Sequence, residues 1–271
     1  MAAHPQHGDL AREAAGLLTP RTLANSQPCL LALLRPGLDV LDVGCGSGTL
    51  TFEIARRVLP GRVVGLDLNT QLLSVARRSA PRGGLPNLRF LEGDIRHAGL
   101  ANEFDLVSAT RVLQWIPDAV RAVAPMAAAL RPGGRMIALD YDHSRTSWAD
   151  APASWTRFHR GFLDWREATR LDNAVVHRLP EAFAAAGLAD VNQVPHVSTV
   201  RSSEPSFFRI VGAWRIMADT RGRQMVTAGY LTERERKDAV ADYTTWMQGP
   251  RAALTLHEAC VSGRRAAASH P

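Results

Sequence analysis

The chain has 271 residues, of which 46% are hydrophobic and 21% are charged, a balance typical of a soluble globular protein. Its 3 cysteines are too few for a disulfide framework, which predicts a reducing, cytoplasmic setting. The sequence has no apolar run long enough for a membrane span, and its first ten residues lack the apolar core of a secretion signal. Membrane-spanning and disulfide-stabilised classes are therefore not expected.

The formal net charge of +6 raises nucleic-acid binding as a function. Only Lys237 is a lysine among the 32 basic residues, and the arginines are spread along the chain with short pairs such as Arg56-Arg57. Charge that is spread in this way is typical of a solvated surface. We therefore expect no nucleic-acid partner.

Alternating apolar segments and turn residues predict strands and helices in regular succession up to residue 140. We expect helices at 22–34, 51–58, 70–79 and 118–130, and strands at 39–43, 63–67, 88–91, 104–109 and 135–140. Pro125 should kink the last of these helices, and a sharp turn is expected at 130–134. Apolar strands that alternate with helices indicate a parallel α/β sheet with helices on both faces.

The second half of the chain is richer in aromatic residues and is expected to be mostly helical. Further helices are predicted at 180–186, 204–219 and 232–247, and strands at 189–200 and 254–261. We interpret the whole chain, 1–271, as one domain. Its parts are a core at 21–140, helical cap segments at 141–188 and 201–250, and last strands at 189–200 and 253–262.

A glycine-rich loop follows the first predicted strand, with Gly44, Gly46 and Gly48 at alternate positions. Glycines let backbone N–H groups approach a ligand, and the helix start behind them adds partial positive charge. The loop therefore predicts a site for a nucleotide-like ligand. Its G-x-G-x-G spacing is neither the dinucleotide fingerprint nor a nucleoside-triphosphate loop.

Two acidic residues follow the next strands of the predicted sheet. Asp67 ends the strand at 63–67, and Asp94 comes just after the strand at 88–91. Because the carboxyl ends of parallel strands line one crevice, both carboxylates are expected at the glycine loop. One carboxylate can accept the hydroxyls of a ribose, and the other can accept the amino group of adenine.

Five segments in this order resemble the class I S-adenosylmethionine-dependent methyltransferases, strongly over 21–140 and loosely beyond. They are Leu41-Asp42-Val43-Gly44-Cys45-Gly46-Ser47-Gly48, Val64-Gly65-Leu66-Asp67, Glu92-Gly93-Asp94-Ile95, Phe104-Asp105-Leu106-Val107 and Leu130-Arg131-Pro132-Gly133-Gly134. The resemblance is closest to small-molecule enzymes akin to those of ubiquinone, menaquinone and bacterial natural-product biosynthesis. It implies a Rossmann-like, seven-stranded, mostly parallel sheet with a helical cap over an acceptor pocket.

The resemblance also implies roles for single residues. Gly44 and Gly46 would face the methionine part of S-adenosylmethionine. Asp67 would bind the ribose, and Asp94 and the backbone of Ile95 would hold the adenine. The remaining candidates for cofactor binding are Arg21 toward the carboxylate, Thr110 toward the amino group, and Asp42, Cys45 and Leu68 around the loop. Each has a structural alternative, such as loop orientation for Asp42, a helix cap for Asp94, a buried filler for Cys45 and a surface position for Arg21.

The implied reaction transfers a methyl group in line to a small-molecule acceptor and leaves S-adenosylhomocysteine. Because the sulfonium is already a good leaving group, the protein needs mainly to position the acceptor and exclude water. Tyr141, Asp142 and His143, just past the fifth strand, are the candidates for a general base. Gln114 and Trp115 are expected to line the acceptor pocket, and no metal is expected.

Other functions remain open at this stage. The segment Ala109-Thr110-Arg111-Val112 lacks the Asn/Asp-Pro-Pro-aromatic pattern of enzymes that methylate nucleic-acid amino groups. An RNA or protein methyltransferase, a nicotinamide-dependent oxidoreductase and a cofactor-binding homologue that does not methylate are the alternatives. The acceptor, the atom methylated and the oligomeric state, a homo-oligomer included, are not determined by the sequence.

Overall fold

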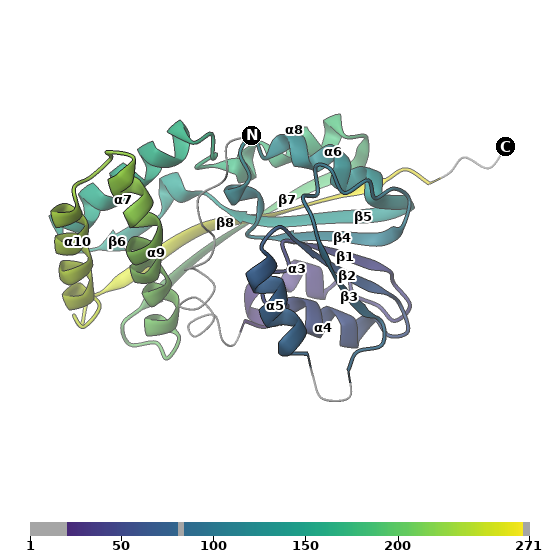
Figure 1. The fold of residues 1–271 in the computed structure, drawn as a ribbon, viewed down its shortest axis with the longest axis horizontal. Coiled ribbons are helices and arrows are strands. Elements are labelled where there is room, and N and C mark those ends of the chain that lie inside the picture. Colours follow the sequence, from purple (N-terminus) through teal and green to yellow (C-terminus); the bar gives the residue numbers. More distant parts are fainter. Residues whose placement is uncertain (1–20, 81–83, 268–271) are drawn as a thin grey trace. The chain divides into compact units, whose positions relative to one another are not determined.

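A computed structural model describes residues 21–80 and 84–267, which form two compact units (Figure 1). Among these residues, unit 1 consists of 142–173 and 197–257, and unit 2 consists of 21–141, 174–196 and 258–267. The predicted cap segment 141–188 is therefore divided, because residues 174–188 pack with unit 2. No helix in the described part of the chain is both long and apolar enough to cross a membrane.

The structure confirms the predicted mostly parallel sheet, but the sheet has eight strands among the described residues and not the predicted seven, because β6 (Ser147–Ala149) is added beside β8. Strands pair in the order β3-β2-β1-β4-β5-β8, and β7 pairs with β8. The pairs among β1 to β5 are parallel, whereas β8 runs antiparallel to β5. The strands are β1 (Val40–Val43), β2 (Val63–Asp67), β3 (Leu88–Glu92), β4 (Phe104–Thr110), β5 (Leu130–Tyr141), β7 (Leu188–Arg201) and β8 (Ala253–Arg265).

Helices cover both faces of the unit 2 sheet, as predicted (Figure 1). On one face, Ile54 and Val58 of α4 (Thr49–Val58) are buried against Val40 and Val63, near α5 (Thr70–Arg78). On the other face, α6 (Val120–Ala129) and α8 (Leu179–Ala185) bury Met126 and other apolar side chains. The short helices η1 (Leu113–Trp115) and η3 (Val175–His177) also belong to this unit.

The helix predicted at 22–34 is wrong in one respect, because the structure divides it. Helix α2 (Leu23–Ser26) ends at Gln27, and α3 (Pro28–Leu31) begins at the proline. Gln27 has a φ of −154°, outside the helical range. Proline has no N–H to donate and is favoured at the first position of a helix, so it starts a new helix here.

The turn predicted at 130–134 is also wrong, because β5 already begins at Leu130. The pairing with β4 shifts between Phe104 and Leu106, whose partners are Leu130 and Arg135. The extra residues, which include Pro132-Gly133-Gly134, form an irregularity within the strand. Proline cannot donate to a neighbouring strand and Gly133 has a φ of +82°, so a bulge accommodates both residues.

Unit 1 is built on three helices and a small sheet. The helices are α7 (Ala153–Ala168), α9 (Phe207–Thr227) and α10 (Glu233–Trp246), and η2 (His143–Arg145) precedes β6 (Ser147–Ala149). Helix α9 begins later and ends later than the predicted 204–219, and α10 follows the predicted 232–247 closely. The strand β6, which was not predicted, pairs antiparallel with residues 253–255 of β8.

Aromatic side chains form the core of unit 1. The ring of Trp155 stacks on Tyr243 with centroids 3.7 Å apart, and Trp148 Nε1 donates a hydrogen bond to the Tyr243 hydroxyl at 3.3 Å. Trp214 contacts Trp148 and Phe162 edge to face. The aromatic residues of the second half therefore serve first to pack the helices of this unit.

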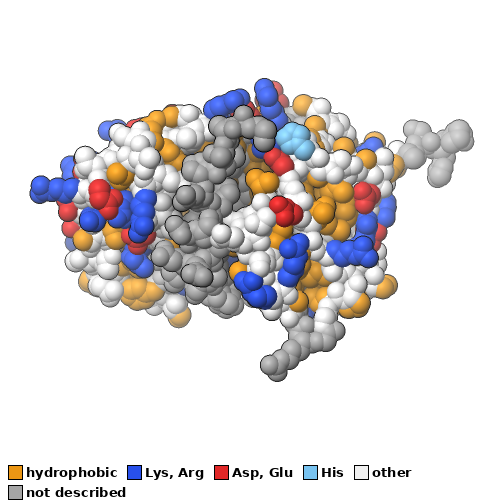
Figure 2. Space-filling view, viewed as in Figure 1, with side chains coloured by type: hydrophobic (Ala, Val, Ile, Leu, Met, Phe, Trp, Pro, Cys, Tyr) orange, Lys and Arg blue, Asp and Glu red, His pale blue; other side chains and the backbone are white. Residues whose placement is uncertain are grey.

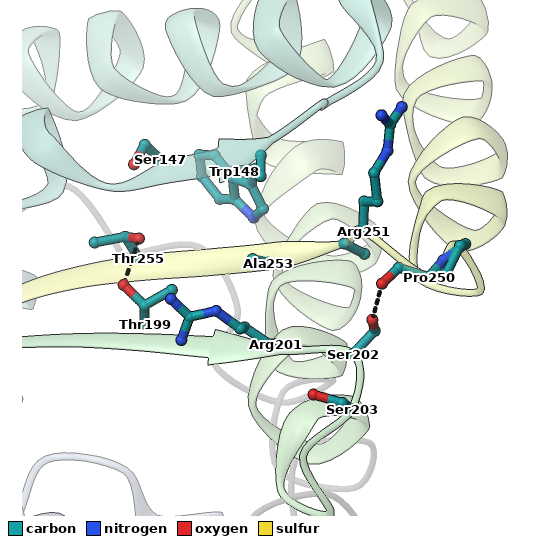
Figure 3. Close-up of a pocket in the computed structure, with 12 residues that line it drawn as sticks. Ser147, Trp148, Thr199, Arg201, Ser202, Ser203, Pro250, Arg251, Ala253 and Thr255 are labelled. Atoms are coloured by element: carbon teal, nitrogen blue, oxygen red, sulfur yellow. Dashed lines mark hydrogen bonds between the residues drawn. The ribbon is translucent and has the colours of Figure 1, made fainter.

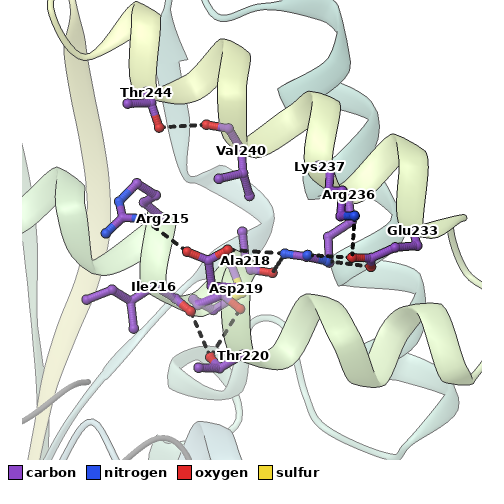
Figure 4. Close-up of polar contacts among 11 residues, drawn as sticks. Arg215, Ile216, Ala218, Asp219, Thr220, Glu233, Arg236, Lys237, Val240 and Thr244 are labelled. Carbon is purple, nitrogen blue, oxygen red and sulfur yellow. Dashed lines mark hydrogen bonds and ion pairs between the residues drawn. The ribbon is translucent and has the colours of Figure 1, made fainter. Parts of the chain in front are cut away.

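A buried arginine joins α9 to α10 in the same unit (Figure 4). The guanidinium of Arg236 donates to both carboxylate oxygens of Glu233 at 2.7 Å and to Asp219 Oδ1 at 3.1 Å. The Arg236 side chain is only 6% exposed, so these ion pairs supply the partners that a buried charge requires.

Candidate functional site

The glycine-rich loop of unit 2 is held against strand β2 by backbone hydrogen bonds. The N–H groups of Gly44 and Cys45 both donate to Leu66 O, at 2.7 and 3.1 Å. Gly48 N donates to Cys45 O at 2.9 Å and then precedes α4 with a φ of +80°. The loop conformation is therefore fixed by contacts of the protein itself.

The three glycines of this loop have different surroundings. A Cβ atom on Gly44 would lie 2.3 Å from Val112 Cγ2, and one on Gly48 would lie 2.9 Å from the Phe90 ring. Gly46 has a φ of +55°, and a Cβ there would meet no atom of the described residues within 4 Å. Gly44 and Gly48 thus serve internal packing, whereas the described residues leave space beside the backbone of Gly46.

Asp67 at the end of β2 meets the loop at that open glycine. Its Oδ2 accepts a hydrogen bond from Gly46 N at 2.7 Å, and its Oδ1 accepts one from Asn69 N at 2.8 Å. A carboxylate oxygen has more than one acceptor site, so both oxygens can accept further donors. The structure therefore brings Gly46 and Asp67 together, and Leu68 beside them is exposed.

Asp42 lies beneath the loop and is buried. It accepts hydrogen bonds from Thr51 Oγ1 at 2.7 Å and Ser108 Oγ at 3.0 Å, which join β1 to α4 and β4. Burial raises the pKa of its carboxyl group to about 6, and nearby Asp67 adds to that rise. These bonds match the orienting role that the sequence left open for Asp42.

Cys45 is the loop residue between Gly44 and Gly46. Burial and the nearby carboxylates raise the pKa of its thiol far above the usual value, so the thiol stays protonated. Its sulfur would lie 3.0 Å from a Cβ placed on Gly65. Cys45 therefore fills space against β2.

Asp94 follows β3 and forms an ion pair with Arg96, a residue that was not predicted to belong to the site. Arg96 donates to Asp94 Oδ2 through Nη2 at 2.6 Å and to both oxygens through Nε at 3.0 Å. These hydrogen bonds lower the pKa of the Asp94 carboxyl group, which stays ionised near neutral pH. The spacing of Asp94 and Arg96, two residues apart, was the feature of the sequence that could have indicated this ion pair. The neighbouring Ile95 is buried in the core.

The end of β4 carries a buried hydroxyl and a buried ion pair. Thr110 Oγ1 has no hydrogen-bond partner within the described part of the chain. The next residue, Arg111, has a φ of +57° and donates to Glu258 Oε1 at 2.6 Å. Sequence reasoning missed this pair, because Glu258 lies 147 residues along the chain.

Arg111 also contacts Tyr141, one of the predicted site residues, at this edge of unit 2. Its guanidinium carbon lies 5.2 Å from the centre of the Tyr141 ring. Burial raises the pKa of Tyr141 to about 12, with Arg111 and Arg21 nearby acting in the opposite direction. The positive charge of Arg21 therefore acts on Tyr141.

The two predicted pocket residues lie in η1, just past β4. Gln114 is buried, and its backbone N donates to Asp140 Oδ2 at 3.1 Å. Its side-chain amide donates to Arg111 O at 3.3 Å. Trp115 is partly exposed. The structure thus ties Gln114 to the end of β5 and leaves the Trp115 ring at the surface.

The other two base candidates, Asp142 and His143, belong to unit 1. Asp142 caps η2 by accepting hydrogen bonds from the Ser144 N–H, at 3.1 Å, and the Ser144 hydroxyl. His143 is buried edge to face against Phe162 and Trp214, with ring centroids 5.7 and 5.8 Å away. Burial lowers the pKa of His143 well below its usual value, with Arg166 and His159 adding to this, so the imidazole is neutral.

Among the described residues, no group of three His, Cys, Asp or Glu side chains is placed to hold a metal ion.

Comparisons with known proteins follow the same segments. Residues 34–177, more than half of the chain, match the family model described as "Methyltransferase domain". A trans-aconitate 2-methyltransferase of Deinococcus radiodurans is 39% identical over 113 residues, 41% of this chain and 42% of that protein. A ubiquinone biosynthesis O-methyltransferase of Methylocella silvestris is 32% identical over 198 residues, 71% of this chain and 70% of that protein.

The fold also has counterparts among solved structures. The YcgJ protein of Bacillus subtilis superposes with a TM-score of 0.60 at 19% identity, covering 90% of this chain and 99% of that one. The chain spans less than half the length of the trans-aconitate enzyme, so that relative supports the domain and not its whole activity. On the extent of the family match and the ubiquinone-pathway relative, the chain belongs to the class I S-adenosylmethionine-dependent methyltransferases.

Proposed function

We propose that this chain binds S-adenosylmethionine at the carboxyl edge of the unit 2 sheet and transfers its methyl group to a small-molecule acceptor. The observation that carries the proposal is the open backbone at Gly46 beside the carboxylate of Asp67. Family membership supports the choice of cofactor.

The residues of this edge fit the cofactor in kind and in position. The acceptor sites that remain on Asp67 suit the two hydroxyls of a ribose. The buried hydroxyl of Thr110, which has no partner within the described chain, suits the amino group of the methionine part. Asp67 ends β2 and Thr110 ends β4, the two parallel strands on either side of β1, and ligands bind at such strand ends in open α/β sheets.

Asp94 is suited to accept the amino group of adenine because Arg96 keeps its carboxyl group ionised. Arg96 occupies part of the acceptor capacity of the carboxylate and fixes its orientation. The Arg96 backbone N–H also donates to Asp94 Oδ1 at 2.9 Å, so an adenine N–H would share the carboxylate with these donors. We therefore keep Asp94 as the adenine residue and add Arg96 as the residue that positions it.

When bound, S-adenosylmethionine supplies a methyl group on a sulfonium, which needs no activation by the protein. The work of the chain is to hold the donor and acceptor in line and to exclude water. His143, one of the predicted bases, belongs to unit 1, and its lowered pKa makes it a weak base. Acceptors that ionise readily, such as carboxylic acids and acidic phenols, therefore fit this chain better than alcohols.

A small-molecule acceptor also agrees with the surface. On the face seen in Figure 2, basic side chains are scattered among acidic and apolar ones and do not gather into one patch. The relatives named for trans-aconitate and ubiquinone biosynthesis suggest carboxylate and phenol acceptors as the first to test.

The experiment has two stages. Calorimetry with S-adenosylhomocysteine tests binding, comparing Asp67→Asn with Glu92→Gln, an exposed carboxylate at the end of the next strand. We expect binding to weaken at least about tenfold only in Asp67→Asn, because a charged acceptor is lost. Release of S-adenosylhomocysteine is then measured with a panel of carboxylic acids, phenols, amines and a tRNA fraction. Equal binding by both variants would refute the site, and release only with tRNA would refute the acceptor class.

A further inference from the structure

Unit 1 contains a cavity of about 630 Å³ that the cofactor proposal does not use (Figure 3). Its walls come from β6, the end of β7, the start of β8 and the loops 202–203 and 250–252. The polar side chains on these walls include Ser147, Thr199, Arg201, Ser203, Arg251 and Thr255. The volume lies within the range of small-molecule sites.

The alternation of side chains along the strands explains this cavity. Val200, Leu254 and Leu256 are buried, as expected for the face that packs against apolar groups. Their neighbours Thr199 and Thr255 point to the other face, where their hydroxyls are hydrogen-bonded to each other at 2.9 Å. This second face carries hydroxyls, an alanine and an arginine, so it is polar and only partly covered.

Arg201 supplies the positive charge of this groove. Figure 3 shows its side chain running back along β7 toward Thr199. The Arg201 backbone N–H donates to Glu204 Oε1 at 2.9 Å, but its guanidinium has no partner within the described chain. Arg251, by contrast, is paired with Asp150 at 3.2 Å.

Hydroxyl groups surround this guanidinium and are available to a ligand. The hydroxyls of Ser147 and Ser203 line the cavity and make no hydrogen bond within the described residues. That of Ser202 is already used, because it donates to Pro250 O at 2.8 Å. A ligand here would meet one forked cation and several neutral donors and acceptors.

We propose that this groove is a binding site for a small hydroxylated organic anion, whose carboxylate or phosphate group pairs with Arg201. The guanidinium fork matches either acidic group through two parallel hydrogen bonds. Ser147 and Ser203 bind the hydroxyls of the ligand. Every residue of the groove belongs to unit 1, whereas the proposed cofactor residues belong to unit 2.

NMR titration of the ¹⁵N-labelled full chain tests this proposal. The probes are glycerate for a carboxylate, glycerol 3-phosphate for a phosphate and glycerol for the neutral body. Arg201→Gln removes the cation, and Arg234→Gln is the matched control, since Arg234 is 91% exposed on α10 and lies outside the groove. Both variants should keep the wild-type melting temperature, because the Arg201 guanidinium has no partner among the described residues and the Arg234–Asp238 ion pair is exposed.

We expect saturable shifts at residues 199–203 with at least one of the two acids and none with glycerol. Arg201→Gln should weaken this binding about tenfold or more, as for the loss of a charge-assisted pair, while Arg234→Gln should bind as the wild type does. A response to only one acid identifies the acidic group. The absence of saturable shifts with both acids, or equal binding by Arg201→Gln, would overturn the proposal.

Discussion

The sharpest test of the site compares two glycines that stand two residues apart. Gly44→Ala and Gly46→Ala each add one methyl group at a positive φ, +69° and +55°. Both therefore carry the strain of an L residue in the left-handed region, about 1–2 kcal/mol. Any further difference between the variants must come from what the new methyl group meets.

The surroundings of the two methyl groups predict that Gly44→Ala mainly lowers stability and that Gly46→Ala mainly weakens cofactor binding. At Gly44 the methyl would lie 2.3 and 2.7 Å from the two Val112 methyl carbons, and relieving such an overlap costs about 1–3 kcal/mol. With the strain term, Gly44→Ala should lower the free energy of unfolding by about 2–5 kcal/mol. At Gly46 the new methyl group meets no atom within 4 Å in the part of the chain that the structure describes, so only the strain term applies to stability. There the methyl group enters the space that we assign to the cofactor.

Urea unfolding and calorimetry with S-adenosylhomocysteine measure the two effects separately. We expect Gly46→Ala to be the more stable variant and to bind at least about tenfold more weakly than the wild type. Adding Val112→Ala to Gly44→Ala should restore part of the lost stability, because it removes the two Val112 methyl carbons that lie nearest to the new methyl group. Wild-type binding by Gly46→Ala would refute the proposed approach of the ligand, and equal stability of the two variants would refute the packing argument.

Three further predictions concern buried charges. Folded Asp42 keeps its proton up to a pKa of about 6 while the unfolded chain releases it near 3.8, so this group makes stability fall as pH rises through that window. Asp42→Asn should therefore gain stability relative to the wild type between pH 4 and about 7, by on the order of 3 kcal/mol, and a pH-independent difference in urea unfolding would contradict this. Glu258→Gln should lower the free energy of unfolding by about 3 kcal/mol, because it leaves buried Arg111 without its carboxylate partner. The control Glu103→Gln breaks the more exposed pair with Arg62 and should lower it by no more than about 1 kcal/mol in the same assay. Arg236→Met should lower the free energy of unfolding by about 2 kcal/mol, and an unchanged urea midpoint would show that the ion pairs of Figure 4 add nothing.

The strands and the glycine loop were predictable because their signals are local. Short apolar runs, each ended by a polar or acidic residue, mark β1, β2 and β4 within a residue or so. Asparagine is a favoured residue at the start of a helix, and the Asn69 side chain accepts from the N–H groups of Gln71 and Leu72 at the start of α5. These features depend on residues that are close in sequence.

The parts that could not be predicted depend on distant residues or on backbone geometry. Nothing local indicates that Val112 closes the space above Gly44, or that Glu258 pairs with Arg111. Pro132 and the glycines after it suggested a turn, but the register with β4 turns them into a bulge within β5. A local turn signal cannot reveal whether the strand continues through it.

Two of the three loop glycines are explained by packing, so the glycine motif alone does not show that a cofactor binds. Gly44 and Gly48 are required by packing against Val112 and Phe90, and backbone bonds to Leu66 hold the loop in place. A chain that had lost methyl transfer would need these same residues to fold, so the motif by itself indicates the fold. Support for a cofactor site lies instead in the space beside Gly46 and in the buried Thr110 hydroxyl, which the described residues neither fill nor pair. Cofactor binding should therefore be tested at Gly46 and Thr110 before acceptors are screened. Without such binding, an observed turnover would have no assigned site for the methyl donor.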